Sequence, residues 1–263
     1  MRAETQANTI LEIQGLTKLF GGLLALDSVD LSLQIGEIRA LIGPNGSGKT
    51  TLLNLVSGVY TPTRGSVFFK GRSVTNKRPH LLVQEGMKRT FQTARLFRDL
   101  TVLENVMIGL HGQTRGGLAG IVLSLPGIKK EEGMICDKAA EALQFVGLHG
   151  QAKALARNLP YGQQRLLEIA RALISNPSLL LLDEPAAGMN PSETSDLVSL
   201  LDRIRQRGTT IFLVEHDMNL VMEISDVVTV LNFGRKIAEG SPAEIQNNEE
   251  VIQAYLGKKA RYA

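Results

Sequence analysis

The chain has 263 residues, with 29 Lys and Arg against 26 Asp and Glu, and its composition is 43% hydrophobic and 21% charged. These values are typical of a soluble globular protein with one large domain, or with a core and a smaller subdomain, and the formal charge of +3 excludes the strongly basic surface of most nucleic-acid-binding proteins. The single cysteine, Cys136, excludes an internal disulfide framework, and no apolar run approaches the ~18 residues of a membrane span, so we expect a cytosolic protein whose membrane contacts are peripheral.

The first part of the chain shows short periodic segments separated by glycines. Alternating apolar and polar residues near the N-terminus predict strands that pair antiparallel and keep one face in water. A buried strand then runs into a glycine-rich loop and a helix that ends at Gly58. The expected elements are strands over 10–14, 26–33, 37–42 and 65–69 and a helix over 49–56.

The middle of the chain changes character. Helical spacing at 101–109 and 134–146, separated by a glycine-rich stretch, predicts a mostly helical subdomain inserted at 91–160. After it, helix and strand alternate, which predicts a parallel sheet covered by helices on both faces. These later elements are helices over 163–174, 192–207 and 218–224 and strands over 179–182, 209–214 and 227–231. Residues 10–90 and 161–240 would then form one core within a single domain, and 241–263 a helical tail.

A glycine-rich loop lies between the buried strand over 37–42 and the helix over 49–56, and it matches G-x-x-x-x-G-K-[ST]. Its glycines let backbone N–H groups converge on phosphate, the helix N-terminus adds partial positive charge, and Lys49 reaches the β- and γ-phosphates. The Thr50 hydroxyl is the expected Mg²⁺ ligand. The loop therefore predicts a nucleotide site formed by Gly43, Pro44, Asn45, Gly46, Ser47, Gly48, Lys49, Thr50 and Thr51.

Two acids follow the apolar strand over 179–182. Asp183 is expected to face the phosphate-bound Mg²⁺, and Glu184 to polarise an attacking water; the alternative is that both only cap a strand end. A guanine-reading Asn-Lys-x-Asp motif is absent, since 76–79 lacks the acid, which disfavours a GTPase.

Taken together, the motifs resemble those of the ATP-binding subunits of ABC transporters over nearly the whole chain. The resemblance implies that Gln92 senses the metal and couples to membrane subunits, that His216 lies near the γ-phosphate, and that Phe20 stacks on adenine. Considered alone, Phe20 is typical of a core aromatic, Gln92 of a polar loop residue and His216 of a helix cap. The order of the motifs along the chain favours the family. The family signature corresponds to 159–163, with Tyr161, Gly162 and Gln163 acting across a dimer.

The resemblance implies an α/β fold of the P-loop NTPase (RecA-like) type, with a parallel core sheet, N-terminal antiparallel strands and an inserted helical subdomain. Because Gly162 and Gln163 open a helix, they predict a second anion site, and in the family each nucleotide lies between one subunit's phosphate loop and the other's signature. Two departures stand out: Pro160 and Tyr161 replace the usual Ser-Gly, and Asn190 stands where aspartate is common.

Several segments further resemble the longer ATPase subunit of branched-chain amino acid importers: 89–97, 123–126, 161–165, 183–191 and 254–257. The resemblance implies ATP and Mg²⁺ as cofactors, a second ATPase subunit that is identical or different, two polytopic permeases and an extracytoplasmic solute-binding protein. It implies a peripheral location on the cytoplasmic face of the inner membrane. Related importers carry urea, amides or other neutral amino acids, and the sequence leaves these solutes open.

Two further classes of protein remain as alternatives. One is a soluble ABC-type ATPase that acts on a protein or nucleic-acid assembly, although the single copy of each motif and the modest charge disfavour it. The other is a nucleotide-binding regulator without turnover, which the complete set of Lys49, Asp183, Glu184 and His216 disfavours. The apolar stretch over 118–126 is interpreted as local core, with a permease-facing patch as the alternative.

Overall fold

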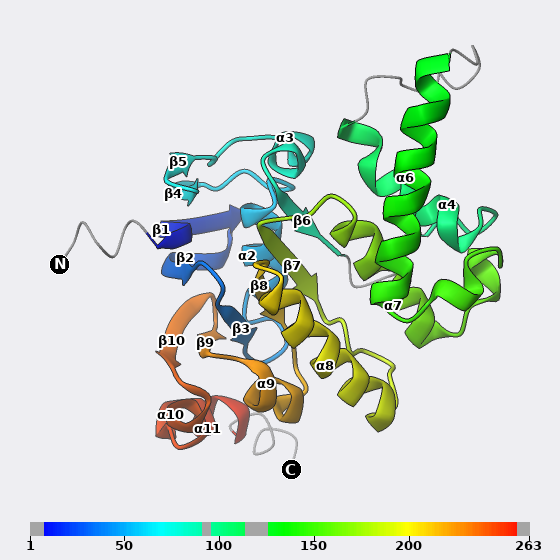
Figure 1. The fold of residues 1–263 in the computed structure, drawn as a ribbon. Helices are drawn as coiled ribbons and strands as arrows, with labels where there is room; N and C mark the ends of the chain where they lie inside the picture. Colours follow the sequence, from blue (N-terminus) through cyan, green and yellow to red (C-terminus); the bar gives the residue numbers. More distant parts are fainter. Residues whose placement is uncertain (1–7, 91–95, 114–125, 257–263) are drawn as a thin grey trace.

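The computed structural model describes residues 8–90, 96–113 and 126–256, and it contains two sheets. The antiparallel sheet has the order β2-β1-β4-β5, and the core sheet has the order β10-β9-β3-β8-β7-β6 (Figure 1). The first sheet comprises β1 (Thr9–Phe20), β2 (Leu23–Gln34), β4 (Arg64–Phe69) and β5 (Arg72–Ser73). The core sheet comprises β3 (Ile38–Ile42), β6 (Met87–Arg89), β7 (Leu179–Asp183), β8 (Thr210–Val214), β9 (Val227–Asn232) and β10 (Arg235–Gly240).

The core sheet is parallel except for its edge strand β10, which pairs antiparallel with β9. The sequence of β7 is continuously apolar because its residues face the two sides of the sheet in turn and both sides are covered by other elements. Leu179 and Leu181 pack with helix α2 (Lys49–Val56) and the antiparallel sheet, whereas Leu180 and Leu182 pack with helices on the other face. Those helices are α8 (Pro191–Gln206) and α9 (Met218–Ile224). The predicted fold class is confirmed.

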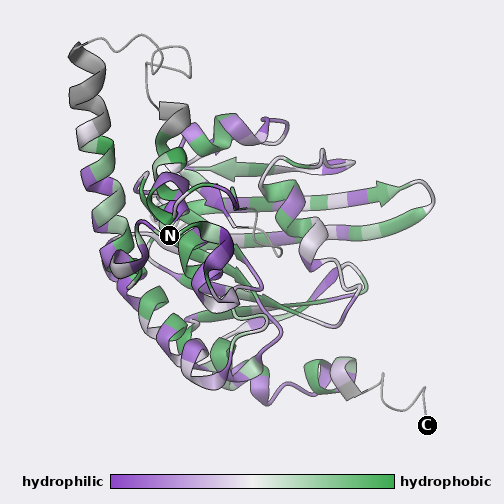
Figure 2. Ribbon diagram, turned by 90° about the vertical axis from the view of Figure 1, so that its right-hand side faces the viewer, coloured by the Kyte–Doolittle hydropathy of each residue, from purple (hydrophilic) through white to green (hydrophobic). Residues whose placement is uncertain are grey.

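The antiparallel sheet follows the expected alternation of residues. Buried and exposed positions alternate along β2 as polar and apolar residues do, and Figure 2 shows the change of hydropathy along the long strands. Strands β1 and β2 are longer than the sequence pattern predicted and extend to a turn at Gly21 and Gly22. Both Lys70 and Gly71 have positive φ, as the tight turn between β4 and β5 requires.

A group of helices lies beside the core sheet, on the side away from the antiparallel sheet (Figure 1). It contains α4 (Val102–Met107), the short 3₁₀ helix η1 (Ile108–Gln113), α6 (Pro126–Phe145) and α7 (Tyr161–Leu173), which contact one another. Thr101 and Glu104 begin α4 with a capping box. Helix α6 begins at Pro126, inside the stretch that the glycine content had suggested as a break.

Elements without a counterpart in the sequence prediction include β5, β6, β10 and helix α3 (Pro79–Gln84). Strand β6 has only three residues, and β10 is a polar edge strand without a clear apolar face. The expected tail begins as two helices, α10 (Pro242–Gln246) and α11 (Glu249–Leu256). Gln92 and residues 118–125 lie outside the described residues. Within the described ranges, no helix combines the length and apolar character that a bilayer crossing requires.

Candidate nucleotide site

The phosphate loop joins β3 to α2, and its shape depends on glycine. Gly43 has φ +148°, and a Cβ there would lie 2.1 Å from the carbonyl oxygen of Leu231. Gly48 has φ +107°, and a Cβ there would lie 2.8 Å from the carbonyl oxygen of Ala25. The neighbouring strands therefore press against the loop so closely that only glycine fits these two positions.

Lys49 is buried, and its ammonium lies within the loop. Its Nζ donates to the carbonyl oxygens of Gly43 at 2.6 Å and Pro44 at 3.1 Å. The Ser47 hydroxyl is also buried and has no hydrogen-bond partner among the described residues. Thr50, the expected metal ligand, is exposed at the start of α2. The loop thus holds an ammonium and a buried hydroxyl in a ring of backbone amides, which fits a polyphosphate.

Asp183 ends β7 as a buried carboxylate that is already paired. Its Oδ2 lies 2.9 Å from Nη2 of Arg89, the last residue of β6. The same guanidinium donates through Nη1 to Asn54 Oδ1 at 2.6 Å and to Ser57 Oγ at 2.8 Å. Arg89 therefore joins the strand ahead of Gln92 to Asp183 and to the end of α2. Sequence reasoning gave Arg89 no role, although an arginine directly before the glutamine segment was a usable signal.

Glu184 follows in an unusual backbone conformation, with φ +47°. Its N–H donates to the carbonyl oxygen of Val214 at 2.9 Å, which anchors the turn after β7 to the end of β8. The Oε2 atom lies 3.7 Å from Nδ1 of His216. Left-handed backbone at a non-glycine residue costs about 1–3 kcal/mol and persists where the surroundings enforce it. The structure therefore brings the two expected hydrolytic residues together.

Glu215 is a functional residue that sequence reasoning missed. It is fully buried, and its Oε1 accepts from the Ala186 N–H at 2.9 Å while Oε2 accepts from the His216 N–H at 2.8 Å. One carboxylate thus holds the turn after Glu184 and the segment that carries His216. The signal was an acid directly ahead of the histidine. Asp217, not His216, caps α9 through its side chain, so the interpretation of His216 as a helix cap is wrong.

Phe20 lies at the end of β1 and is 40% exposed, so the interpretation as a core aromatic is wrong. Its ring meets that of Tyr60 edge to face, with the centroids 5.3 Å apart. The ammonium of Lys18 lies 5.0 Å from the Phe20 centroid. Strand β2 returns from the same hairpin to pack Ala25 against Gly48, so Phe20 belongs to the strand pair that supports the phosphate loop, whereas Tyr60 follows α2.

The signature segment opens α7 as expected, with Pro160 at the N-cap and Tyr161 as the first helical residue. Tyr161 is exposed at the surface, whereas Gly162 is buried against the Glu193 carboxylate, to which a Cβ would approach within 2.7 Å. Gln163 follows in the first turn. Asn190, the second departure, caps α8 by accepting from the Glu193 N–H at 3.0 Å. The side-chain amide of Asn190 therefore makes this contact within its own chain.

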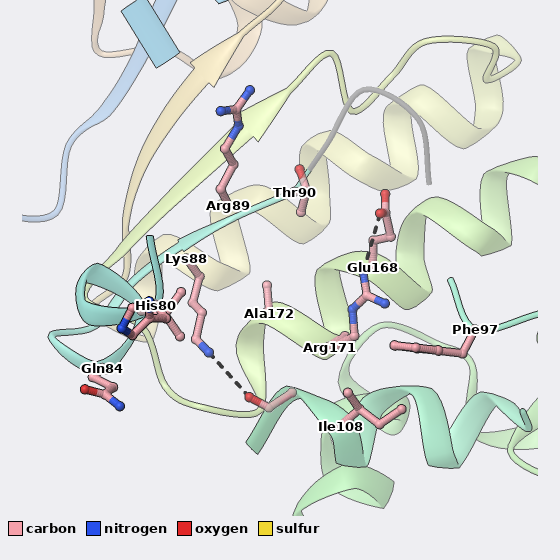
Figure 3. Close-up of a pocket in the computed structure, with 12 residues that line it drawn as sticks. His80, Gln84, Lys88, Arg89, Thr90, Phe97, Ile108, Glu168, Arg171 and Ala172 are labelled. Atoms are coloured by element: carbon pink, nitrogen blue, oxygen red, sulfur yellow. Dashed lines mark hydrogen bonds and ion pairs between the residues drawn. The ribbon is translucent and has the colours of Figure 1, made fainter. Parts of the chain in front are cut away.

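A pocket of about 300 Å³ lies between β6, η1 and α7, next to the strand that leads to Gln92 (Figure 3). Lys88 reaches across it to the Gly109 carbonyl oxygen at 3.4 Å, and burial lowers the pKa of the Lys88 ammonium. Glu168 and Arg171 of α7 line the opposite wall and pair with each other. The pocket therefore presents charged groups at the junction of the core sheet and the helical group.

The donor set for a metal is small. Within the described ranges, no group of three or more His, Cys, Asp or Glu side chains is arranged to hold an ion. One buried carboxylate, Asp183, and one exposed hydroxyl, Thr50, fit a Mg²⁺ ion that takes most of its ligands from phosphate and water.

Comparison with known proteins places the chain in a family. Residues 26–187 match the family model described as ABC transporter, and residues 235–261 match the model described as branched-chain amino acid ATP-binding cassette transporter. The high-affinity branched-chain amino acid transport ATP-binding protein LivG of Salmonella typhimurium is 46% identical over 95% of this chain and 98% of its own length.

Solved structures agree with this match. The crystal structure of a nucleotide-free ATP-binding cassette from an ABC transporter is similar at TM-score 0.83 and 36% identity, covering 94% of this chain and 98% of that one. A dimeric cassette bound to ADP and phosphate after hydrolysis is similar at TM-score 0.75 and 28% identity, covering 89% of this chain and 99% of that one. The chain belongs to the ATP-binding subunits of ABC transporters, which couple ATP hydrolysis to transport in complexes with other subunits.

Proposed function

We propose that this chain is the ATP-hydrolysing motor of an importer for branched-chain amino acids. The observation that supports the motor most directly is the 3.7 Å approach of Glu184 to His216 at the carboxyl end of the sheet that carries the phosphate loop. The solute class follows from the similarity to LivG and from the match over residues 235–261. Residues 10–90 and 161–240 act as the nucleotide core, 91–160 as the helical subdomain and 241–263 as the tail.

In this proposal the phosphate loop binds the ATP phosphates. Lys49 exchanges its carbonyl partners for the β- and γ-phosphates, and the amides of the loop from Gly43 to Thr51 bind the remaining oxygens. Phe20 stacks on adenine beside Tyr60. Thr50, Asp183 and Gln92 would hold Mg²⁺, which would supply positive charge beside the phosphate oxygens.

Hydrolysis then depends on the corner formed by Glu184, Glu215 and His216. Glu184 accepts a proton from the attacking water, because its carboxylate follows β7 directly and lies at the same end of the sheet as the phosphate loop. His216, with an exposed ring, donates to the γ-phosphate. Glu215 stays buried and holds the turn after Glu184 close to the segment that carries His216.

Dimerisation completes the site. Tyr161, Gly162 and Gln163 open a helix at the surface, and the N-terminal amides of α7 provide an anion site for the nucleotide held by a second ATPase subunit. The permeases dock at the pocket beside β6, because it joins the core to the helical group and is lined by Arg89 and Thr90, the residues that lead in sequence toward Gln92. The complex includes two polytopic permeases and an extracytoplasmic solute-binding protein, and the chain lies on the cytoplasmic face of the membrane.

The test is capture of a stalled complex. The Glu184→Gln variant retains the shape of the site but lacks the base, so MgATP should hold the ATPase dimer closed. Tagged variant protein is incubated with MgATP and detergent-solubilised membranes of its own cell, and every stoichiometric partner is identified by mass spectrometry. We expect two polytopic membrane proteins and a second ATPase subunit.

Controls separate the parts of the proposal. The double variant Lys49→Ala with Glu184→Gln cannot hold MgATP, so its ATP-dependent partners should be lost. Recovery of soluble proteins alone would reject the importer and favour a soluble ATPase that acts on another assembly. Transport assays with the recovered permeases then compare leucine with urea and amides, and uptake of an amide or urea alone would reject the proposed solute class.

A further inference from the structure

A continuous series of polar side chains runs along one side of α7, the helix that opens with the signature. Its members are Tyr161, Arg165, Glu168 and Arg171, spaced three or four residues apart, as neighbours on one helix face are. Glu168 lies at the centre. Its Oε2 is 3.1 Å from Nη1 of Arg165, and its Oε1 is 3.6 Å from Nη2 of Arg171.

The series continues to the first residue of the helix. Nη2 of Arg165 donates to the Tyr161 hydroxyl at 2.8 Å, and the guanidinium carbon lies 5.2 Å from the centroid of the tyrosine ring. Tyr161 is therefore held both by a charge-assisted hydrogen bond and by a cation–π contact. We name these four residues the α7 relay.

One end of the α7 relay lies in the pocket beside β6. Arg171 and Glu168 line that pocket, and Figure 3 shows their side chains on its α7 wall, facing the region of Lys88 and Phe97. Burial lowers the pKa of the Arg171 guanidinium while Glu168 opposes that shift. A group that binds in the pocket therefore contacts the Arg171 guanidinium, whose charge is partly balanced by the Glu168 carboxylate.

The other end of the relay touches the turn that carries Glu184. The tyrosine ring packs on Gly188, where a Cβ would lie 3.0 Å from Cε1 of Tyr161, and Gly188 has φ +78°. Within this turn the Ala187 N–H donates to the Glu184 carbonyl oxygen at 3.2 Å. Displacing the ring therefore changes the space available to the backbone four residues after the hydrolytic glutamate.

The middle of the relay is too buried to rearrange in isolation. The exposed fractions of Arg165 and Glu168 are 3% and 2%. Separating buried charges from their partners is strongly unfavourable, so the pairs must move together or keep their geometry. A change in how Arg171 is paired is consequently passed to Arg165 through the carboxylate that both arginines share.

We propose that Arg165 and Tyr161 are positioning residues that transmit occupation of the pocket beside β6 to the turn that carries Glu184. The occupant is a cytoplasmic segment of the permease, so the inference rests on the proposed function. Pairing of that segment with Arg171 shifts Glu168 and Arg165, the Tyr161 ring moves against Gly188, and Glu184 is brought to its hydrolytic position. Because Tyr161 also belongs to the signature, the nucleotide of the second subunit acts on the same turn.

Hydrogen exchange of the full-length subunit tests this link without a permease. Exchange is followed in the peptide 184–190 for the wild type and for Arg171→Gln, Tyr161→Phe and the double variant. We expect each single variant to speed exchange of this peptide about threefold or more, and the double variant to add nothing beyond the larger single effect. The matched control is Lys88→Gln, which changes the same pocket but lies outside the relay, and it should leave the peptide unchanged.

Two further measurements exclude general loosening of the fold. Peptides from the core sheet, such as 37–42, should keep wild-type protection in every variant, and Arg171→Lys should restore part of the protection of 184–190. Effects of Arg171→Gln confined to α7, or single effects that multiply in the double variant, would overturn the relay. Failure of the permeases to bind at all would instead reject the proposed function, and the exchange result would stand separately.

Discussion

The phosphate loop and the hydrolytic corner lie at the same end of one sheet, yet they are built in different ways. Backbone shapes the phosphate loop: Gly43 and Gly48 adopt positive φ against the carbonyls of neighbouring strands. Side chains shape the hydrolytic corner, where Glu215 holds two separate segments through their N–H groups. The loop is thus continuous in sequence, whereas the corner is assembled from β7, β8 and the turns after them.

This difference predicts how each region fails. A loop made of backbone tolerates exchange of most side chains but not the addition of a Cβ. A corner made of side chains tolerates small changes of shape but not the loss of an ionised oxygen. Substitutions that add one methyl group or replace one oxygen by nitrogen therefore separate the two regions.

The largest effect is expected at the corner. Glu184→Gln removes the proposed base while keeping the size of the side chain, and kcat for ATP hydrolysis should fall by roughly 10²–10⁴. Because the phosphate loop is untouched, ATP affinity should stay within about threefold, as expected for a group that acts only in the transition state. Steady-state hydrolysis and fluorescent-nucleotide titration measure the two quantities. Glu223→Gln, an exposed acid on α9, is the control. Unchanged kcat in Glu184→Gln would reject the assignment.

In the phosphate loop, the corresponding test is Gly43→Ala. The new Cβ would overlap the Leu231 carbonyl oxygen, so the loop must move, and overlap with strain together cost about 2–6 kcal/mol. We expect nucleotide affinity to fall by about 10–10³-fold together with thermal stability. Gly36 also has a positive φ, +79°, although it differs from the +148° of Gly43, and a Cβ at Gly36 would meet no described atom within 4 Å, so Gly36→Ala measures backbone strain without a steric overlap. Equal effects of the two substitutions would show that the close approach to Leu231 is unimportant.

A smaller effect is expected when the support of the corner is altered. Glu215→Gln replaces one carboxylate oxygen, which accepts either from the Ala186 N–H or from those of His216 and Asp217, by an amide N–H₂, and this leaves at least one backbone donor unpaired at a cost of about 1–3 kcal/mol. Chemical denaturation should report this loss, and hydrolysis should slow by about tenfold because the turn after Glu184 is less well held. The control Asp217→Asn keeps an equally good helix cap on α9 and should change stability by less than about 0.5 kcal/mol. A Glu215→Gln variant with wild-type hydrolysis would show that the corner does not depend on this carboxylate.

The same contrast explains what the sequence could predict. The loop Gly43–Thr51, the helix after it and the buried strand that ends in Asp183 each occupy one continuous segment, so local pattern is enough to find them. Asn190 and Pro191 likewise predict the start of α8, and the structure shows the cap with its hydrogen bond.

What the sequence could not predict depends on contacts between distant segments. Arg89 meets Asp183 only because β6 pairs with β7, and β6 is too short to show a periodic pattern. Glu215 is recognisable only once the Ala186 amide is known to lie beside it. Tyr60 meets the Phe20 ring only when the β1–β2 hairpin is in place. In each case the missing information is the partner, not the residue type.

The smallest effect is expected at the edge of the site, at the exposed Phe20 that we propose stacks on adenine. Phe20→Ala should weaken ATP binding by about threefold to tenfold, the range that one aromatic stacking contact provides, and should leave kcat unchanged because the ring touches neither the phosphates nor Glu184. The chain contains no tryptophan, so Phe20→Trp retains a stacking ring and introduces a single fluorophore. Its emission should change on addition of ATP and remain constant with inorganic triphosphate, which lacks the base. An equal change of emission with ATP and with inorganic triphosphate would show that adenine does not stack on this ring. The contacts of the nucleotide would then be limited to the phosphate loop.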